Sequence, residues 1–274
     1  ISPCLVGSEM CIRDSVSTSC SLVSGNESKE KAQIDWEEQF KGNYKLMSEE
    51  EKKATVERLA RSYELRTGKT INLSSQGPEE NVLFGYAFNI SKCQGYMDCV
   101  NACVEENNQD RNSQMQYIRI HEMKDGKGFN FNEADDNYYH EVPAEGHFYM
   151  GTQCFHCDNP PCTKVCPVQA TWQEEDGLVV IDYDWCVGCR YCMAAWPYDG
   201  RRFNWSQPEV PEAEINKNQH YLGNRLRKKG VMEKCTFCVQ RSRAGKNPAC
   251  VEACPTGARI FGNLLDPNLS LIHI

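Results

Sequence analysis

Cysteine is the residue that most constrains how this chain can fold, because 17 of its 274 residues are cysteines. Fourteen of them fall in four short runs, numbered I to IV in chain order. Run I holds Cys93, Cys99 and Cys103; run II holds Cys154, Cys157, Cys162 and Cys166; run III holds Cys186, Cys189 and Cys192; run IV holds Cys235, Cys238, Cys250 and Cys254. Such close spacing predicts that the cysteines act together as ligands of metal clusters.

The four runs form an internal repeat. Runs I and III share one layout, whereas runs II and IV both end in C-x3-C-P, followed closely by an alanine at Ala170 and Ala258. Two residues between thiolates wrap the backbone around one cluster face, so that backbone amides can point at the sulfurs and offset negative charge. A cysteine before proline ligates the second cluster of a pair, and the proline redirects the chain. The pattern therefore predicts iron–sulfur clusters bound in pairs.

Other uses of cysteine fit this spacing less well. Zinc is often held by C-x2-C pairs, but zinc does not account for four-cysteine runs that end in C-x3-C-P. A disulfide framework does not explain such tight, regular runs, and covalent haem needs C-x-x-C-H, whereas no C-x-x-C here is followed by histidine. Two alternative functions remain open: a zinc-stapled structural or interaction protein, and a stand-alone ferredoxin-type redox module.

The rest of the composition narrows the function. The hydrophobic fraction is 40% with cysteine included and the formal net charge is −8, so we expect no nucleic-acid partner. No run of 18 apolar residues is present, which predicts no transmembrane helix. The sequence contains no Ser/His/Asp pattern, Walker loop or G-x-G-x-x-G. We therefore expect no catalytic residues and no substrate chemistry on this chain.

Both ends of the chain resemble translated sequencing-adapter DNA. Met10–Ser15 and Leu269–Ile274 can be encoded by opposite strands of one oligonucleotide. We therefore expect residues 1–15 and the last six residues to be artefacts, which sets Cys4 and Cys11 aside. The true N-terminus, with any export signal, is then missing from the sequence.

Residues 16–80 are expected to form a linker followed by a helical extension. The sequence around Cys20 looks like the end of a bacterial lipoprotein signal, so Cys20 is a candidate lipid anchor; the alternative is a spare cysteine in a polar tail. Farther along, Ser48 and Glu51 form a capping box and Gly68 supplies a stop. These signals predict one helix between them.

The cysteine-rich, ferredoxin-like body is expected to span residues 81–268. Strand-like runs flank the cysteines at Val82–Ile90, Met115–Ile120 and Leu178–Ile181. Residues 200–233 are interpreted as a polar insertion with a solvated basic surface. Its basic residues are Arg225, Arg227, Lys228 and Lys229.

Three stretches carry a family resemblance: Cys154–Pro167, Cys186–Tyr198 and Lys234–Ala258. With them, residues 82–265 resemble the four-cluster, ferredoxin-like electron-transfer subunits of bacterial molybdopterin oxidoreductases, such as polysulfide, dimethyl sulfoxide, tetrathionate and nitrate reductases. The resemblance implies an α+β fold of two bacterial-ferredoxin-like units with two clusters each. Runs II and III would form an inner unit, at about 145–200, inserted in an outer unit of runs I and IV.

The resemblance also implies which cysteines share a cluster, and we name these groups sets A to D. Sets B and D are complete: set B is Cys103, Cys235, Cys238 and Cys250, and set D is Cys166, Cys186, Cys189 and Cys192. Set A is Cys93, Cys99 and Cys254, with Tyr96 where the family has its second cysteine. Set C is Cys154, Cys157 and Cys162, with Trp196 in the slot of the partner cysteine. Sets A and C thus lack one thiolate each.

Three thiolates suit a [3Fe–4S] cluster, which lacks the iron that a fourth ligand would hold. We therefore expect at least two [4Fe–4S] clusters, with one or two [3Fe–4S] or otherwise altered clusters at the gaps. Asp98 is a candidate oxygen ligand near Tyr96, which would leave an ordinary cluster with a substitute ligand. Sequence error or loss of a cluster is the remaining alternative at each gap. Losing a thiolate removes negative charge, which raises the reduction potential.

The resemblance implies a one-electron relay in anaerobic respiration, between a molybdopterin-type catalytic subunit and an integral membrane quinone-reactive subunit. We expect Phe155, Tyr191, Trp196 and Phe237 to be buried near the clusters and to exclude water, although core packing explains these aromatic residues equally well. We also expect membrane association through the partner subunits. The periplasmic side is favoured if Cys20 carries a lipid, and the cytoplasmic side is the alternative.

Overall fold

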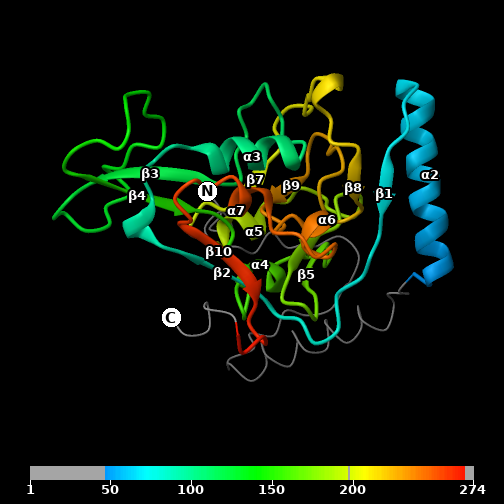
Figure 1. Ribbon diagram of the computed structural model, residues 1–274. Coiled ribbons are helices and arrows are strands. Elements are labelled where there is room, and N and C mark those ends of the chain that lie inside the picture. The colour runs from blue at the N-terminus through cyan, green and yellow to red at the C-terminus, as the bar shows by residue number, and fades with distance from the viewer. Residues whose placement is uncertain (1–46, 197, 269–274) are drawn as a thin grey trace, which may run out of the picture. The chain divides into compact units, whose positions relative to one another are not determined.

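A computed structural model describes residues 47–196 and 198–268. The chain divides between Ser48 and Glu49 into two units, and every element named below belongs to the second unit (Figure 1). The candidate lipid anchor Cys20 and the two adapter-like ends lie outside the described residues. Within the described ranges, no helix has the length and apolar character that a membrane span requires.

Helix α2, Glu49–Thr67, begins and ends where the sequence predicts. Three glutamates in its first turn match the positive end of the helix dipole. Gly68 ends the helix in a left-handed conformation with φ of 71°, and its N–H donates to the Glu64 carbonyl at 2.7 Å. Tyr63 is buried, whereas most of the helix surface is polar and exposed.

The strands of the described residues are short and pair into five two-stranded sheets. The one parallel sheet joins β1 (Asn72–Ser74) to β8 (Asn218–His220). The antiparallel sheets join β2 (Phe84–Phe88) to β10 (Arg259–Asn263), β3 (Arg119–Lys124) to β4 (His147–Thr152), β5 (Thr171–Gln173) to β6 (Val179–Ile181), and β7 (Arg201–Phe203) to β9 (Met232–Lys234).

The remaining helices are also short, and each lies within or overlaps a cysteine run. They are α3 (Asp98–Glu106), α4 (Pro161–Lys164), α5 (Tyr191–Ala194), α6 (Val239–Ser242) and α7 (Ala249–Glu252), with 3-10 turns η1 (Ile90–Lys92) and η2 (Glu212–Glu214). A mixture of short helices and short sheets fits the expected α+β class.

Segments far apart in sequence lie side by side in this fold. Strand β2, which precedes run I, pairs with β10, which follows run IV (Figure 1). Phe88 lies opposite Arg259 in this pair. Helix α3 of run I contacts α7 of run IV, and α4 of run II contacts α5 of run III. Runs I and IV therefore meet each other, as do runs II and III.

The cysteines are part of the hydrophobic core rather than additions to its surface. One buried cluster combines Cys99, Cys103, Cys154, Cys235 and Cys250 with apolar residues of β3, β4 and β6. A second, smaller cluster packs Cys162 and Cys192 against the other face of β6 and against β9. Cysteines from all four runs therefore lie in the interior of the fold.

The strand predicted at Met115–Ile120 is displaced. The structure places β3 at Arg119–Lys124, where pairing with β4 begins opposite Thr152. Met115, Tyr117 and Ile118 are buried all the same. A buried apolar loop and a buried strand give similar sequence patterns, so the sequence located the buried segment but not the pairing.

The solvated basic surface predicted in the insertion is wrong for one residue and partly wrong for another. Arg227 is buried and its Nε lies 2.8 Å from Glu233 Oε2, which is also buried. The Arg225 side chain is only 11% exposed, whereas Lys228 and Lys229 are exposed as expected. A run of charges does not show that a carboxylate elsewhere in the chain will pair with one of them.

Candidate metal centres

The loops of the four cysteine runs share one backbone turn. The residue before the second ligand slot has positive φ in every run: Gly95 at 79°, His156 at 45°, Gly188 at 71° and Phe237 at 49°. Glycine adopts this conformation freely, whereas histidine and phenylalanine adopt it at a cost that the surrounding structure must offset. The turn therefore belongs to the cysteine motif itself and not to any one residue type.

Comparing the backbones of runs I and III also shows which position Tyr96 occupies in its run. Tyr96 is followed by Met97, with φ of 61°, at the N-terminus of α3; Cys189 is followed by Arg190, with φ of 65°, at the N-terminus of α5. Tyr96 thus occupies in run I the backbone position that Cys189 has in run III. Its side chain is 44% exposed, and its hydroxyl donates to Gln94 Oε1 at 2.6 Å.

Set B comes together from runs I and IV. Burial raises the pKa of the Cys103 thiol well above its usual value, and the nearby thiols of Cys238, Cys235 and Cys250 raise it further. The Asn107 amide lies within hydrogen-bond range of two of these sulfurs, 3.5 Å from Cys103 Sγ and 3.4 Å from Cys238 Sγ. The cysteine that ends run I therefore joins run IV.

Set D comes together from runs II and III. Cys166, Cys186, Cys189 and Cys192 line one small cavity, together with Arg201 and loop residues of run III. Cys166 belongs to run II in sequence, but it faces the three cysteines of run III. This crossing mirrors that of Cys103 in set B.

Sets A and C contain three cysteines each, one fewer than sets B and D. Burial and the nearby Cys99 and Cys254 thiols raise the pKa of Cys93, although backbone hydrogen bonding from Gly95 opposes this. In set C, Cys154 and Cys162 are both buried. Cys157 is half-buried.

Trp196 closes the gap in set C with its ring. It is 4% exposed and packs against Phe155 and Tyr198, with ring centroids 5.5 and 5.3 Å away. Gly200 lies so close that a Cβ there would fall 2.5 Å from the indole and 3.1 Å from the Cys154 backbone nitrogen. The indole therefore fills the space beside set C.

Backbone amides point at cysteine sulfurs where the repeat predicts them. Ala170 N donates to Cys166 Sγ at 3.2 Å, and Ala258 N donates to Cys254 Sγ at 3.3 Å. Both alanines lie four residues after the cysteine of a C-P pair. These bonds stabilise a negative sulfur and thus suit a cluster ligand.

The buried groups around the cysteines fit an anionic multi-metal cluster. Burial raises the pKa of Cys235 to about 12 and that of Cys238 to about 11, so the bare thiols resist ionisation and bound metal would supply the positive charge that ligation needs. Nearby, Arg201 Nε and Nη1 and Arg259 Nη2 are buried, and none of them has a nitrogen or oxygen hydrogen-bond partner among the described residues. In the described ranges, no group of three or more His, Cys, Asp or Glu side chains converges closely enough to hold a single metal ion.

The expected aromatic shield is only half correct. Trp196 and Phe237 are buried, but Phe155 is 43% exposed and Tyr191 is 64% exposed. Phe155 lies in the tight turn of run II, and Tyr191 begins α5, so their side chains point outward while the neighbouring cysteines point inward. Sequence analysis also missed Arg201, Lys234 and Arg259, which lie buried against the cysteines.

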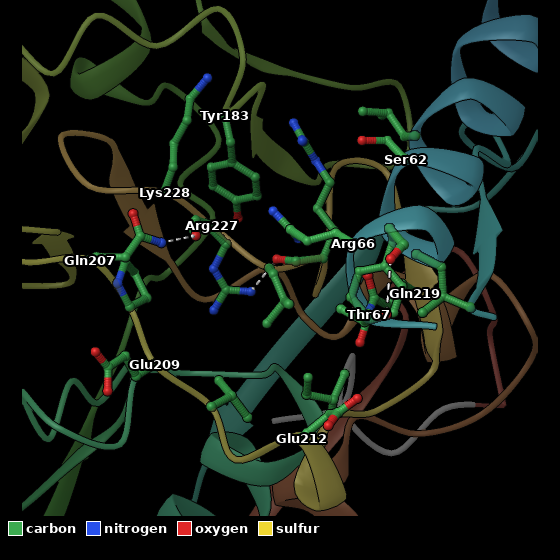
Figure 2. A pocket seen from close by; sticks show the side chains of 18 of the residues that line it. Ser62, Arg66, Thr67, Tyr183, Gln207, Glu209, Glu212, Gln219, Arg227 and Lys228 are labelled. Carbon is green, nitrogen blue, oxygen red and sulfur yellow. Dashed lines mark hydrogen bonds between the residues drawn. The ribbon is translucent and has the colours of Figure 1, made fainter. Parts of the chain in front are cut away.

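A pocket of about 820 Å³ lies elsewhere, between α2 and residues 207–228 (Figure 2). Ser62 and Arg66 reach it from the helix, and Gln207 and Lys228 from the opposite segment. No cysteine lines it, so this pocket is separate from the metal centres.

Known proteins with similar sequences include an iron–sulfur cluster-binding subunit. The family model of the 4Fe-4S dicluster domain matches residues 146–220 and 219–264. A subunit of the tetrathionate reductase of Salmonella typhimurium is 50% identical over 115 residues, which cover 42% of this chain and 37% of that protein. The menaquinone reductase iron–sulfur cluster-binding subunit of Nitratidesulfovibrio vulgaris is 33% identical, over 69% of this chain and 78% of that protein.

A third relative comes from the anaerobic dimethyl sulfoxide reductase of Escherichia coli. This component of the reductase is 35% identical over 179 residues, which cover 65% of the present sequence and 73% of that protein. The relatives, the dicluster match and the gathered cysteines agree with one another. The protein belongs to the family of iron–sulfur electron-transfer subunits of molybdopterin oxidoreductases.

Proposed function

We propose that the chain relays single electrons through four iron–sulfur clusters, between a molybdopterin-type catalytic subunit and an integral membrane quinone-reactive subunit. The clusters supply one-electron exchange when bound. The residues of this chain hold them, exclude water from them and place fixed charges and hydrogen bonds around their sulfurs. The relatives named as reductase components support such a role within a larger complex.

The observation that carries the proposal is the crossing of cysteines between runs. Cys166 lines the cavity of the run III cysteines, and Cys103 lies with the run IV cysteines. Crossed ligation is the arrangement by which two-cluster ferredoxins bind their clusters in pairs. A zinc-stapled protein would have no need of it.

We further propose that the outer unit of runs I and IV encloses the inner unit of runs II and III. The pairing of β2 with β10 and the contact of α3 with α7 support this arrangement. The local β5–β6 pair and the contact of α4 with α5 support a separate inner unit.

Sets A and C are proposed to hold [3Fe–4S] clusters. Tyr96 is turned to solvent and bonded to Gln94, and an indole has no lone pair to offer a metal. Asp98 is exposed and begins α3, where its charge already suits the helix dipole. Neither gap therefore has a fourth ligand among these three side chains.

The proposed location is the membrane surface, reached through the partner subunits. The periplasmic side is proposed on the lipoprotein-like sequence at Cys20. A single lipid gives weak attachment, and a membrane partner subunit would supply the second contact.

Anaerobic purification of the full chain tests the relay. We expect broad absorbance near about 400 nm, as in iron–sulfur proteins generally, that bleaches with dithionite, together with iron and acid-labile sulfide. A colourless protein with stoichiometric zinc would overturn the proposal in favour of a zinc-stapled protein. Electron paramagnetic resonance of the oxidised protein should show a [3Fe–4S] signal, and a silent spectrum at full iron loading would contradict it.

A ligand swap tests the crossing. Cys166→Ser and Cys186→Ser should weaken the same resonance signal, because both cysteines belong to set D although they lie in different runs. Cys154→Ser, in run II with Cys166, is the matched control and should alter a different signal. If Cys166→Ser and Cys154→Ser instead alter one signal, the crossing is wrong.

A further inference from the structure

Three buried cations lie against the cysteines without any carboxylate partner. Arg201, Lys234 and Arg259 are each at most 3% exposed, and none of them takes part in an ion pair with a described residue. The buried Arg227 and Arg243, by contrast, pair with carboxylates: Glu233 in one case, Glu174 and Asp176 in the other. A buried charge is costly unless an opposite charge compensates it, so the first three cations require an anion that is not a carboxylate.

Arg201 lies between sets C and D. Its Nη2 donates to Cys162 Sγ of set C at 2.9 Å and to Thr171 Oγ1 at 3.0 Å. The same side chain lines the cavity of set D beside Cys192. Its charge and its hydrogen bonding also act on the Cys192 thiol of set D, so one guanidinium serves cysteines of both sets.

Lys234 lies between sets B and C. It directly opposes Arg201 in the β7–β9 pair, and its Nζ donates to the carbonyl of Cys235 in set B at 2.5 Å. Burial lowers the pKa of Lys234, and the Cys154 and Cys162 thiols of set C oppose that change. Two basic residues directly opposite each other destabilise a strand pair, so this arrangement also requires a nearby negative group.

Arg259 lies between sets A and B. Its Nη1 donates to Tyr86 Oη at 2.7 Å and to Gln153 Oε1 at 2.5 Å. Burial opposes the charged form of Arg259, but the Tyr86 hydroxyl, the Cys99 thiol of set A and the Cys250 thiol of set B together raise its pKa. The Cys99 thiol is also a hydrogen-bond partner of the guanidinium.

The repeat places two of these cations in equivalent positions. Arg259 follows Cys254 by five residues and begins β10, and Arg201 follows the Trp196 slot by five residues and begins β7. The equivalent position after Cys166 is Thr171, the first residue of β5, which accepts the Arg201 hydrogen bond. A cation at this position therefore reaches a cysteine set from the start of a strand.

We propose that Arg259, Lys234 and Arg201 form a series of buried cations, each shared by two neighbouring cysteine sets, that raises the reduction potentials of the clusters on both sides of it. The proposal rests on the function proposed above, because it needs clusters in the four sets. Reduction adds negative charge, and net charge near a cluster is a determinant of its potential. A shared cation also reduces the repulsion between two neighbouring clusters, so an electron on one disturbs the next one less.

Potentiometric titration of the full, cluster-loaded chain, followed by electron paramagnetic resonance, tests the proposal. Arg259→Met, Lys234→Met and Arg201→Met each remove one charge and keep an unbranched apolar side chain. We expect the midpoint potentials of two centres to fall in each variant: those of sets A and B, B and C, and C and D in turn. The expected fall is a tenfold change in the ratio of oxidised to reduced cluster, or about 59 mV for one electron.

Two controls separate charge from packing. Arg201→Lys keeps the charge and should leave iron content and potentials near those of the parent chain. Lys229→Met removes an exposed charge and should shift no centre. If Arg201→Met fails to load iron while Arg201→Lys loads fully, a charge requirement at this position is supported; if both fail, the role of Arg201 is packing and the proposal is wrong.

The outcomes also separate this proposal from the relay. Absence of iron and sulfide in the parent chain would overturn the proposed function itself. Fully loaded variants with unchanged potentials, or with equal shifts in all four centres, would overturn the cation series and leave the relay intact.

Discussion

The loops around Tyr96 and Trp196 fill the same kind of gap in two different ways. The family resemblance assigns each residue to the slot of a cluster-ligating cysteine. Tyr96 is 44% exposed and bonded to a surface glutamine, so the slot in set A is open to water. Trp196 is 4% exposed under a layer of aromatic rings, so the slot in set C is covered by apolar surface.

The comparison shows that a ligand slot without cysteine can be filled by another side chain, as Trp196 fills the slot beside set C. Solvent exposure and net charge both influence the potential of an iron–sulfur cluster. Set A combines a missing thiolate with access to water, whereas set C combines a missing thiolate with a dry wall and the buried cation Arg201 at 2.9 Å from Cys162 Sγ. We therefore expect the clusters that are proposed for sets A and C to differ in stability and in potential.

The largest expected difference is in folding stability. Trp196→Ala should lower the free energy of unfolding by about 3–5 kcal/mol, because it empties a buried aromatic site. Tyr96→Ala is the matched change at the exposed gap and should cost no more than about 0.5 kcal/mol. Guanidinium denaturation followed by circular dichroism measures both, and equal losses would remove the distinction between the two gaps.

The next largest difference is expected when a cysteine is introduced at each of the two slots. Tyr96→Cys should add one iron per chain and convert one [3Fe–4S] signal, because the backbone there already matches that at Cys189. Trp196→Cys should convert the other signal with a lower yield, since it also leaves a cavity. Gln94→Cys and Tyr198→Cys place thiols near the slots but out of register, and an iron gain in either control would contradict the slot assignment.

A smaller effect is expected from the rings that cover Trp196. Phe155→Ala removes two aromatic contacts, with ring centroids 5.5 Å away at Trp196 and 5.4 Å away at Tyr198. It should cost about 0.5–1.5 kcal/mol for each ring pair. It should also make the set C signal more sensitive to oxygen, because water and solutes gain access. Phe129→Ala, at an exposed ring remote from the cysteine runs, is a suitable comparison and should leave that sensitivity unchanged.

The smallest effect is expected at Asp98. Asp98→Asn should lower stability by about 0.3–1 kcal/mol, the usual value of an acidic side chain at a helix N-terminus. The set A resonance should keep its shape. Loss or conversion of that signal would show instead that Asp98 is the substitute ligand.

The four cysteine runs can be read directly from the sequence because the spacing of neighbouring ligands is a local property. Ser48 and Gly68 likewise mark the two ends of a helix. Ala170 and Ala258, which the repeat relates, each donate a backbone N–H to a cysteine sulfur. These features depend on a few neighbouring residues, so they can be predicted directly from the sequence.

The features that the sequence missed depend on partners far away in the chain. Arg227 was expected on the surface and is buried because Glu233 pairs with it. Arg201 and Lys234 meet only through the β7–β9 register, and nothing local marks either as buried. The repeat held one overlooked signal, since Arg201 and Arg259 both lie five residues after a ligand slot.

The pairing of β2 with β10 has a consequence for the order in which the parts of this protein fold. These strands flank nearly the whole body, so their pairing closes a very long loop, whereas β5 and β6 meet across a short turn. Since a chain folds as it leaves the ribosome, we expect sets C and D to be assembled first. Sets A and B both need cysteines of run IV, so iron inserted during synthesis should reach the inner pair of sets before the outer pair exists.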